Sequence, residues 1–323
     1  MSTDNQWINN KIKLGIAKCL LGEKVRYDGS QKLDRYLRDV LGQYVEWVPV
    51  CPEVECGMSI PREAVRLVGD LESPRLVGRS SGKDWTDTMH EWGKERLDRL
   101  ASEGICGYVF KFGSPSSGMN RVKVYQEGNR VRHDGTGMWA RMVMEKFTDL
   151  PFEDDGRLHD PALRESFISR VFTLKRWRDA MSEGFTARTL VEFHTRHKML
   201  IMAHNEKIYR AMGKIVAKAG TDVPERVFPE YFEMLFNALT YKLTVKKHIN
   251  VLMHAFGYFK KDLNADEKQE MLELLDQFSK ELIPLVAPVT LLNHYVRKYS
   301  KEYLAKQYYL NPYPAELMLR NHV

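Results

Sequence analysis

The sequence predicts an α/β domain with a short parallel, Rossmann-like sheet, followed by an all-α domain. In the N-terminal half, short apolar runs bounded by turn residues alternate with stretches of helical spacing, a pattern that favours parallel strands joined by crossover helices. In the C-terminal half the strand signal nearly vanishes and apolar residues recur at helical spacing. A largely polar connector covers residues 150–163. We therefore place the two domains at residues 1–155 and 156–323.

In the N-terminal domain, the apolar runs predict three strands, over residues 13–18, 44–50 and 107–112. Helical spacing predicts helices over residues 32–41, 85–103 and 137–146. The segment 69–82 is rich in Gly and Ser and is predicted to be a loop. In the C-terminal domain, helical spacing covers five stretches, over residues 164–182, 186–219, 228–256, 265–287 and 289–308.

Composition excludes several classes of protein. The chain has 323 residues, of which 43% are hydrophobic and 28% charged, and its net charge is +6. No run of about 18 apolar residues is present, so no transmembrane helix is expected. The first 13 residues lack the apolar core of a secretory signal, which predicts a cytoplasmic protein. A disulfide framework is not expected in that compartment, so the four cysteines are structural, catalytic or metal-binding.

Reactive side chains follow the predicted strands. Cys19 follows the first strand, and Cys51 follows the second, with Glu53 and Cys56 close behind. The third strand leads into the turn Ser114–Gly118. The carboxyl ends of parallel strands meet at one edge of a sheet, where ligands bind. Three thiols there suit Zn²⁺ or an iron–sulfur cluster, although buried cysteines that bind nothing are common.

Cys106 is excluded from this group. It stands at the start of the third predicted strand. A strand of about seven residues spans roughly 20 Å, which puts Cys106 at the opposite edge of the sheet.

Three sequence blocks carry a family resemblance. CLLGEKVRYDG (19–29), VPVCPEVECGMSIPREAVRLVG (48–69) and GYVFKFGSPSSGMNRVKVY (107–125) resemble the TudS-like thiouracil desulfidase family over roughly residues 10–150. In the second half, RTLVEFH (188–194), the pair His197-Lys198, MAH (202–204), YRAMG (209–213) and YLNPYPAEL (309–317) resemble the YbgA-like domain. A fusion of these two domains resembles the RudS type of bacterial desulfidase.

The resemblance implies a concrete activity. Such enzymes hold a [4Fe-4S] cluster by three cysteines, leave one iron open, and convert 4-thiouridine in tRNA to uridine with release of sulfide. The implied partner is thiolated tRNA, and neither a membrane nor DNA is expected as a partner. Two alternatives stay open: a desulfidase of free thiolated nucleobases such as thiouracil, and a non-enzymatic RNA-binding protein that lacks a cluster.

One motif departs from the family. Family members commonly have Ser-Pro-Ser-Cys-Gly where this chain has Ser114-Pro-Ser-Ser117-Gly. The third thiolate is therefore expected from Cys56, beside Cys19 and Cys51; the alternative is a weaker or different cluster, or none.

Other side chains of the α/β domain have predicted roles. Glu53 is the expected base that activates or orients water. Ser114 and Ser117 are expected to hold the substrate or water by hydrogen bonds. Arg26 and Asp28 contact the base or a phosphate, or alternatively form an ordinary turn salt bridge.

The predicted helical domain carries basic and aromatic residues. Lys198 lies in a stretch with His194, His197 and His204, and Lys246 and Lys247 form a second basic cluster with Lys242. Near the C-terminus, Lys and Arg alternate with tyrosines. Such interleaving suits RNA, because cations meet phosphates and rings stack on bases. Lys198, Lys246 and Lys247 are therefore expected to contact tRNA, although histidines and tyrosines at helical spacing are equally typical of a packed core.

Overall fold

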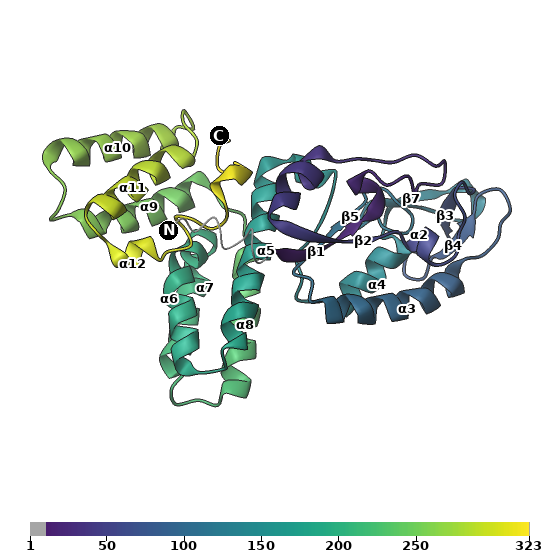
Figure 1. Ribbon diagram of the computed structural model, residues 1–323, viewed down its shortest axis with the longest axis horizontal. Coiled ribbons are helices and arrows are strands. Elements are labelled where there is room, and N and C mark those ends of the chain that lie inside the picture. Colours follow the sequence, from purple (N-terminus) through teal and green to yellow (C-terminus); the bar gives the residue numbers. More distant parts are fainter. Residues whose placement is uncertain (1–10, 323) are drawn as a thin grey trace. The chain divides into compact units, whose positions relative to one another are not determined.

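The computed structural model describes residues 11–322, and the chain divides into two compact units, Met1–Phe167 and Ile168–Val323 (Figure 1). Each unit is considered by itself. The division falls inside helix α5 (Pro161–Ser182), later in the chain than the connector that the sequence suggests. The prediction that no secretory signal is present depends on residues 1–13, most of which lie outside the described part.

The first unit contains the predicted parallel sheet. Its strands lie in the order β2 (Val45–Val50), β1 (Ile12–Ala17), β5 (Tyr108–Phe110) and β8 (Phe152–Asp154), and all neighbours are parallel. The chain moves from β1 to β2 on one side and then returns to β5 on the other. The strand order therefore reverses between the neighbouring strands β1 and β5. Open α/β sheets bind ligands at the carboxyl edge of such a topological switch point.

Close packing fixes this sheet against its helices. Helices α3 (Thr86–Glu103) and α4 (Met138–Lys146) run side by side (Figure 1). Buried Trp139 of α4 donates a hydrogen bond from Nε1 to Tyr108 Oη of β5 at 3.0 Å. A Cβ at Gly15 of β1 would lie 2.1 Å from the Tyr108 ring, so only glycine fits where β1 passes β5.

A second sheet corrects the predicted loop at 69–82. It has the order β4 (Arg75–Gly78), β3 (Val65–Val68), β6 (Val122–Tyr125) and β7 (Val131–Gly135). Its own small core contains Leu67, Leu76, Val122 and Val124. Strands of four or five residues that bury few side chains give little periodic signal, and the Gly and Ser residues belong to their turns.

Two further predictions in this unit are corrected. The connector at 150–163 contains β8, a three-residue strand too short to give a pattern. In place of the predicted helix at 32–41, the chain forms a short π-helix over Tyr36–Val40, followed by a 3-10 turn over Leu41–Gln43. The Asp34 carboxylate accepts a hydrogen bond from the backbone N–H of Leu37 at 3.0 Å, so the helical backbone begins later than predicted.

The second unit is helical throughout its described residues, which confirms the predicted fold class. After α5 it contains α6 (Ala187–His204), α7 (Glu206–Lys218), α8 (Pro224–Thr240), α9 (Val245–Phe256), α10 (Ala265–Ser279), α11 (Val286–Lys298) and α12 (Glu302–Ala305). None of the described helices is long and apolar enough to cross a membrane.

Three stretches predicted as single helices are each broken in two; in the last, over residues 289–308, α11 ends at Lys298 and α12 begins at Glu302. The Asn205 side chain accepts a hydrogen bond from the Ile208 N–H, which ends α6 and caps α7. Thr244 caps α9 in the same way through the Lys247 N–H. Both residues are of the type that starts helices, and apolar periodicity continues across such breaks unchanged.

Four histidines of the second unit are buried in its core, namely His194, His197, His204 and His248. His194 Nδ1 lies 3.1 Å from Tyr231 Oη, and His248 Nδ1 lies 2.9 Å from Tyr309 Oη. Burial lowers the pKa of His194 to about 4 and that of His248 to about 3. These rings are therefore neutral packing groups at neutral pH.

The buried histidines predict a pH-dependent stability. Above the unfolded pKa of about 6.5 both states are neutral at these sites, but below it the unfolded chain binds protons that the folded core excludes. Stability should fall from pH 6.5 towards pH 5 by up to about 1.4 kcal/mol per pH unit for each histidine. Urea unfolding followed by circular dichroism at pH 7, 6 and 5 measures this slope. His248→Gln should reduce the slope by one proton, and a flat profile in the wild type would contradict the prediction.

Candidate active site

A cavity of about 320 Å³ lies where β1, β2 and β5 end. It is at the carboxyl edge of the parallel sheet, beside the switch point. Sequence-predicted residues that line it are Cys19, Arg26, Cys51, Glu53, Ser114 and Ser117. The structure therefore brings residues from three strand ends together, as predicted from the topology.

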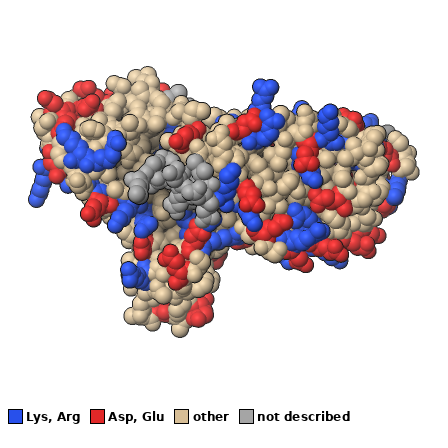
Figure 2. Space-filling view, in the orientation of Figure 1, with Lys and Arg blue, Asp and Glu red and all other residues tan. Residues whose placement is uncertain are grey.

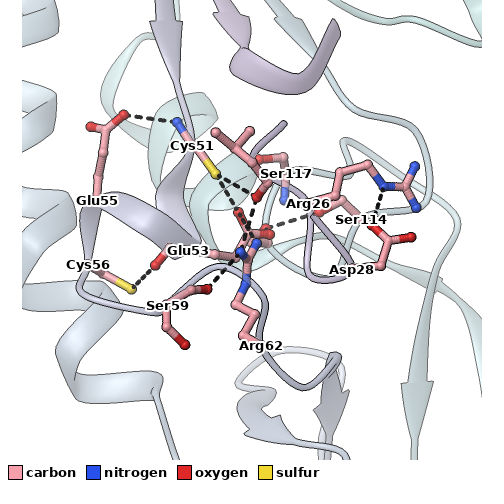
Figure 3. A network of polar contacts seen from close by, with 12 residues as sticks. Arg26, Asp28, Cys51, Glu53, Glu55, Cys56, Ser59, Arg62, Ser114 and Ser117 are labelled. Atoms are coloured by element: carbon pink, nitrogen blue, oxygen red, sulfur yellow. Dashed lines mark hydrogen bonds and ion pairs between the residues drawn. The ribbon is translucent and has the colours of Figure 1, made fainter. Parts of the chain in front are cut away.

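Glu53 is at the centre of the polar contacts (Figure 3). The Cys51 thiol lies 3.5 Å from Glu53 Oε2, and the Ser116 hydroxyl donates a short hydrogen bond to Glu53 Oε1. Arg62 Nη2 lies 3.9 Å from Oε2, and both side chains of this ion pair are mostly buried. Glu53 is thus an oriented carboxylate beside a thiol.

A short helix positions Cys51 and Glu53. Pro52 occupies the first turn of α2 (Pro52–Glu55), where its fixed φ suits a helix start. The Glu55 carboxylate accepts a hydrogen bond from the Cys51 N–H at 2.9 Å and lies 3.5 Å from Arg96 Nε. These contacts hold the end of β2 so that Cys51 and Glu53 both face the cavity.

The turn that carries Ser117 is fixed by α4. The α4 residues Met138 and Ala140 donate backbone hydrogen bonds to the carbonyls of Pro115 and Ser116, each at 3.1 Å. A Cβ at Gly137 would lie 2.5 Å from the Ser116 oxygen, so this close approach requires glycine. Ser117 therefore has a defined position in the cavity wall.

Positive charge dominates the cavity lining. Five of its described residues are cationic, namely Lys18, Arg26, Lys32, Arg62 and Lys111, against the single carboxylate of Glu53. Lys111 Nζ is held 2.9 Å from Asp155 Oδ2, and the same carboxylate accepts from the Phe112 N–H. Such a lining favours an anionic ligand or leaving group.

Burial raises the pKa of the cavity thiols. The pKa of Cys19 rises to about 11 because the thiol is buried, and the Glu53 carboxylate adds to the effect. The pKa of Cys51 is raised for the same two reasons. In the absence of a metal both groups are thiols at neutral pH, and a metal that binds them must displace two protons.

Cys56 does not line the cavity. Its Sγ lies 3.3 Å from the backbone oxygen of Glu53, and its side chain packs in the small core beneath the second sheet. Figure 3 shows it apart from Cys51. The sequence favoured Cys56 as the third thiolate, but the structure brings Ser117 rather than Cys56 beside Cys19 and Cys51. One turn of α2 separates Cys51 from Cys56, so the two side chains leave the backbone in different directions.

Of the other predicted residues, Arg26 and Ser114 line the cavity and Asp28 does not. The Asp28 carboxylate accepts hydrogen bonds from the N–H and hydroxyl of Ser30, and Arg26 Nε lies 3.9 Å from Oδ1. Asp28 is not part of the lining and closes its own turn. Ser114 lines the cavity, and its hydroxyl accepts from the Ser117 N–H at 3.1 Å.

The three lysines predicted to contact tRNA belong to the second unit. Lys247 donates from Nζ to the backbone oxygens of His204 and Lys242 at 2.7 and 2.6 Å. It therefore supports the end of α6. Lys246 is exposed, and Lys198 lines a cavity within the second unit.

Sequence reasoning missed Arg62, Lys111, Ser116 and Asp155. Lys111 carries a detectable signal, because it is a cation in the otherwise apolar predicted strand 107–112, although β5 itself ends at Phe110. Asp155 could be found only by recognising β8. Nothing in the local pattern of Arg62 distinguishes it from a surface residue.

The donor set fits a cluster only with an oxygen at one position. In the range 11–322, no three or more His, Cys, Asp or Glu residues are grouped so that they could hold a metal ion. Cys19 and Cys51 line the same cavity and are the two thiols available there, and Ser117 places a hydroxyl where the resembling family has cysteine. Iron–sulfur clusters are held mainly by thiolates, so the third ligand is the weak point of this site.

Comparison with known proteins divides the chain in the same way. Residues 14–155 match the family model described as 2-thiouracil desulfurase, and residues 198–314 match the one described as a protein of unknown function (DUF1722). The chain joins a TudS-like domain to a YbgA-like domain.

Individual relatives match parts of the chain. The YbgA protein of Escherichia coli (strain K12) is 28% identical over 158 residues, which cover 49% of this chain and 94% of that protein. The YbbK protein of Bacillus subtilis (strain 168) is 29% identical over 108 residues, which cover 32% of this chain and 71% of that protein. A solved structure of the [4Fe-4S]-dependent thiouracil desulfidase TudS is 28% identical, with a TM-score of 0.39, over 48% of this chain and 99% of that chain.

All residues of the TudS-like cavity fall within the desulfurase match. The resemblance identified from the three strand-end blocks is therefore confirmed at the level of domains. The match supports a desulfidase of thiolated nucleobases.

Proposed function

We propose that this chain is an iron–sulfur-dependent desulfidase that converts 4-thiouridine in tRNA to uridine and releases sulfide. The observation that supports it most is the cavity itself. Two buried thiols, an oriented carboxylate and several cations meet at the switch point of a domain that matches the desulfurase family.

The TudS-like domain would hold a [4Fe-4S] cluster through Cys19 and Cys51, with Ser117 at the third position. When bound, the cluster supplies a Lewis acid for the sulfur of the thiocarbonyl group.

The remaining chemistry is proton transfer. Glu53 accepts a proton from water as the water oxygen forms a bond to the thiocarbonyl carbon. Glu53 returns this proton to the sulfur, the carbon–sulfur bond breaks and hydrosulfide leaves, while the remaining hydroxyl proton passes to solvent. A C=S group and water thus give a C=O group, HS⁻ and H⁺ with no net oxidation. Arg62 and Ser116 hold Glu53 in place. The cations of the lining favour the anionic leaving group.

The cavity rim suits a planar base. Tyr27 and Phe112 both line the cavity, and each is an exposed aromatic side chain, at 44% and 48%. Base–aromatic stacking contributes about 1–3 kcal/mol per base, so exposed rings at the rim of a cavity can hold a base. These two rings would hold the thiolated pyrimidine over the thiols.

The positive net charge is consistent with a nucleic-acid partner, but on the face shown in Figure 2 it is not concentrated in one broad surface. The net charge is +6, yet Figure 2 shows acidic and basic side chains interspersed over the visible face. Phosphate contacts would therefore be made at particular residues and not by a broad basic surface. Free thiolated nucleobases are the second candidate substrate, because the cavity and its aromatic rim lie wholly within the first unit.

The decisive experiment uses the full chain, reconstituted without oxygen, on tRNA that contains 4-thiouridine. Nucleoside analysis should show 4-thiouridine lost, uridine gained and sulfide released in equal amounts. A parallel assay with free thiouracil separates the two substrates. If reconstituted protein binds iron but desulfurises neither, the proposed function is wrong.

The third ligand can be tested by two substitutions. Ser117→Cys should increase the iron retained after desalting, because it adds a thiolate at a position that already lines the cavity. Cys56→Ser should leave iron content unchanged, because its Sγ faces the small core. Iron loss in Cys56→Ser, with no gain in Ser117→Cys, would instead assign the third ligand to Cys56.

A further inference from the structure

A second cavity, of about 310 Å³, lies within the helical unit. Residues of α6, α7, α9 and α12 line it, together with Tyr258 of the turn after α9. Buried Met199 and Met202 contribute apolar surface. The remaining lining residues are polar or aromatic, namely Lys198, Glu206, Tyr209, Arg210, His254, Tyr258 and Tyr303.

The rings and cations of this cavity are arranged together. Tyr258 and Tyr303 stack with ring centroids 5.1 Å apart and planes inclined by 24°. Lys198 Nζ lies 4.6 Å from the centroid of the Tyr303 ring. Tyr258 is 48% exposed, so it has ring surface that Tyr303 does not cover.

The charges of this cavity are available to a ligand. Among the described residues, Lys198 has no carboxylate within ion-pair distance. Arg210 pairs with Glu206 at 2.6 Å, but its side chain is 74% exposed, and an exposed pair of this kind contributes little. A phosphate that binds here could therefore replace Glu206 as the partner of Arg210 with little loss of free energy. It could also bind Lys198 without displacing a carboxylate.

This set of groups matches one nucleotide. A base can stack on the open part of Tyr258, a phosphate can meet Lys198 and Arg210, and Glu206 can accept a hydrogen bond from a base N–H. The volume is at the lower end of the ~300–1,000 Å³ usual for small-ligand sites, enough for one nucleotide.

We propose that this cavity binds one unpaired nucleotide of a single-stranded RNA segment. The inference deepens the proposed function and depends on it in one respect, namely that the RNA is the thiolated substrate. The chemistry of the cavity also suits a free nucleotide, and the experiment separates the two sources.

The test measures binding to the full chain. The probes are a fluorescein-labelled single-stranded oligouridylate of about ten residues, followed by anisotropy, and uridine monophosphate, followed by calorimetry. Tyr258→Leu should weaken oligouridylate binding at least about fivefold through loss of stacking. Lys198→Gln should weaken it and reduce the log–log salt slope by about 0.7, the value for one phosphate contact on a single strand.

Matched controls separate this cavity from general charge and aromatic effects. Lys214 is exposed on α7 and Tyr241 is 44% exposed after α8, and neither lines the cavity. Lys214→Gln and Tyr241→Leu should bind oligouridylate as the wild type does. Equal effects of the control and cavity variants would overturn the proposal, as would tight binding of uridine monophosphate without binding of the oligomer.

An assay of free thiouracil desulfurisation separates failure of the nucleotide-binding proposal from failure of the proposed function. Tyr258→Leu and Lys198→Gln should not change it, because both residues lie in the helical unit. Loss of oligouridylate binding in these variants supports the cavity even if the wild type has no desulfidase activity. Wild-type binding in both variants overturns the cavity even if the enzyme is active.

Discussion

Replacing Cys51 with alanine is expected to reduce both bound iron and desulfidase activity to background. Cys19→Ala should do the same. Each variant removes one of only two thiols that line the active-site cavity, and the third position already holds a hydroxyl in place of a thiolate. With a single thiolate left, a cluster has too few soft ligands to stay bound. Iron and acid-labile sulfide per chain, measured after anaerobic reconstitution, test this directly.

Cys106→Ala is the matched control for these variants. Cys106 is also buried, but its backbone N–H bonds to the Lys13 oxygen, near the start of β1 and away from the edge that carries Cys19. The variant should keep wild-type iron content. If Cys51→Ala folds, as judged by circular dichroism, and still holds wild-type iron, the ligand assignment fails.

The site could be located from the sequence because the parallel strand topology determines which residues lie at the ligand-binding edge of the sheet. Once residues 13–18, 44–50 and 107–112 are parallel strands, whatever follows them meets at one edge, so Cys19, Cys51 and the serine turn had to converge. Which way each side chain points is a finer matter. Cys51 and Cys56 stand five residues apart, and only the α2 turn decides that one faces the cavity and the other the small core.

The fold was less predictable where its elements are short. The long periodic helix at 85–103 is present almost as predicted, as Thr86–Glu103. The strands β3, β4, β6 and β8 have three or four residues each, and two of their pairings, β3 with β6 and β8 with β5, join segments remote in sequence. Lys111 directly follows β5 and Asp155 directly follows β8, and the two side chains form an ion pair. This pair could not be predicted without first recognising β8.

In the helical unit, residues of the same types occur both in the packed core and in the lining of the second cavity. Four of its histidines and several of its tyrosines pack in the core, as His194 with Tyr231 and His248 with Tyr309. Lys247 is held by two backbone oxygens. Lys198, Tyr258 and Tyr303 instead surround a cavity, and sequence spacing alone does not distinguish these three from the packed residues.

Glu53→Gln is expected to lower kcat for free thiouracil by about 10²–10⁴, the usual contribution of a general base, while iron content and KM stay near wild type. Glutamine keeps the shape of the side chain and can still accept the Ser116 hydrogen bond, but it cannot take a proton from water. Glu55→Gln is the matched control two residues away. Glu55 supports the Cys51 N–H and does not line the cavity, so its substitution should change kcat by only a few fold. A Glu53→Gln variant with full iron and wild-type kcat would remove Glu53 from proton transfer. A variant that loses iron in parallel with activity would assign Glu53 to cluster binding instead.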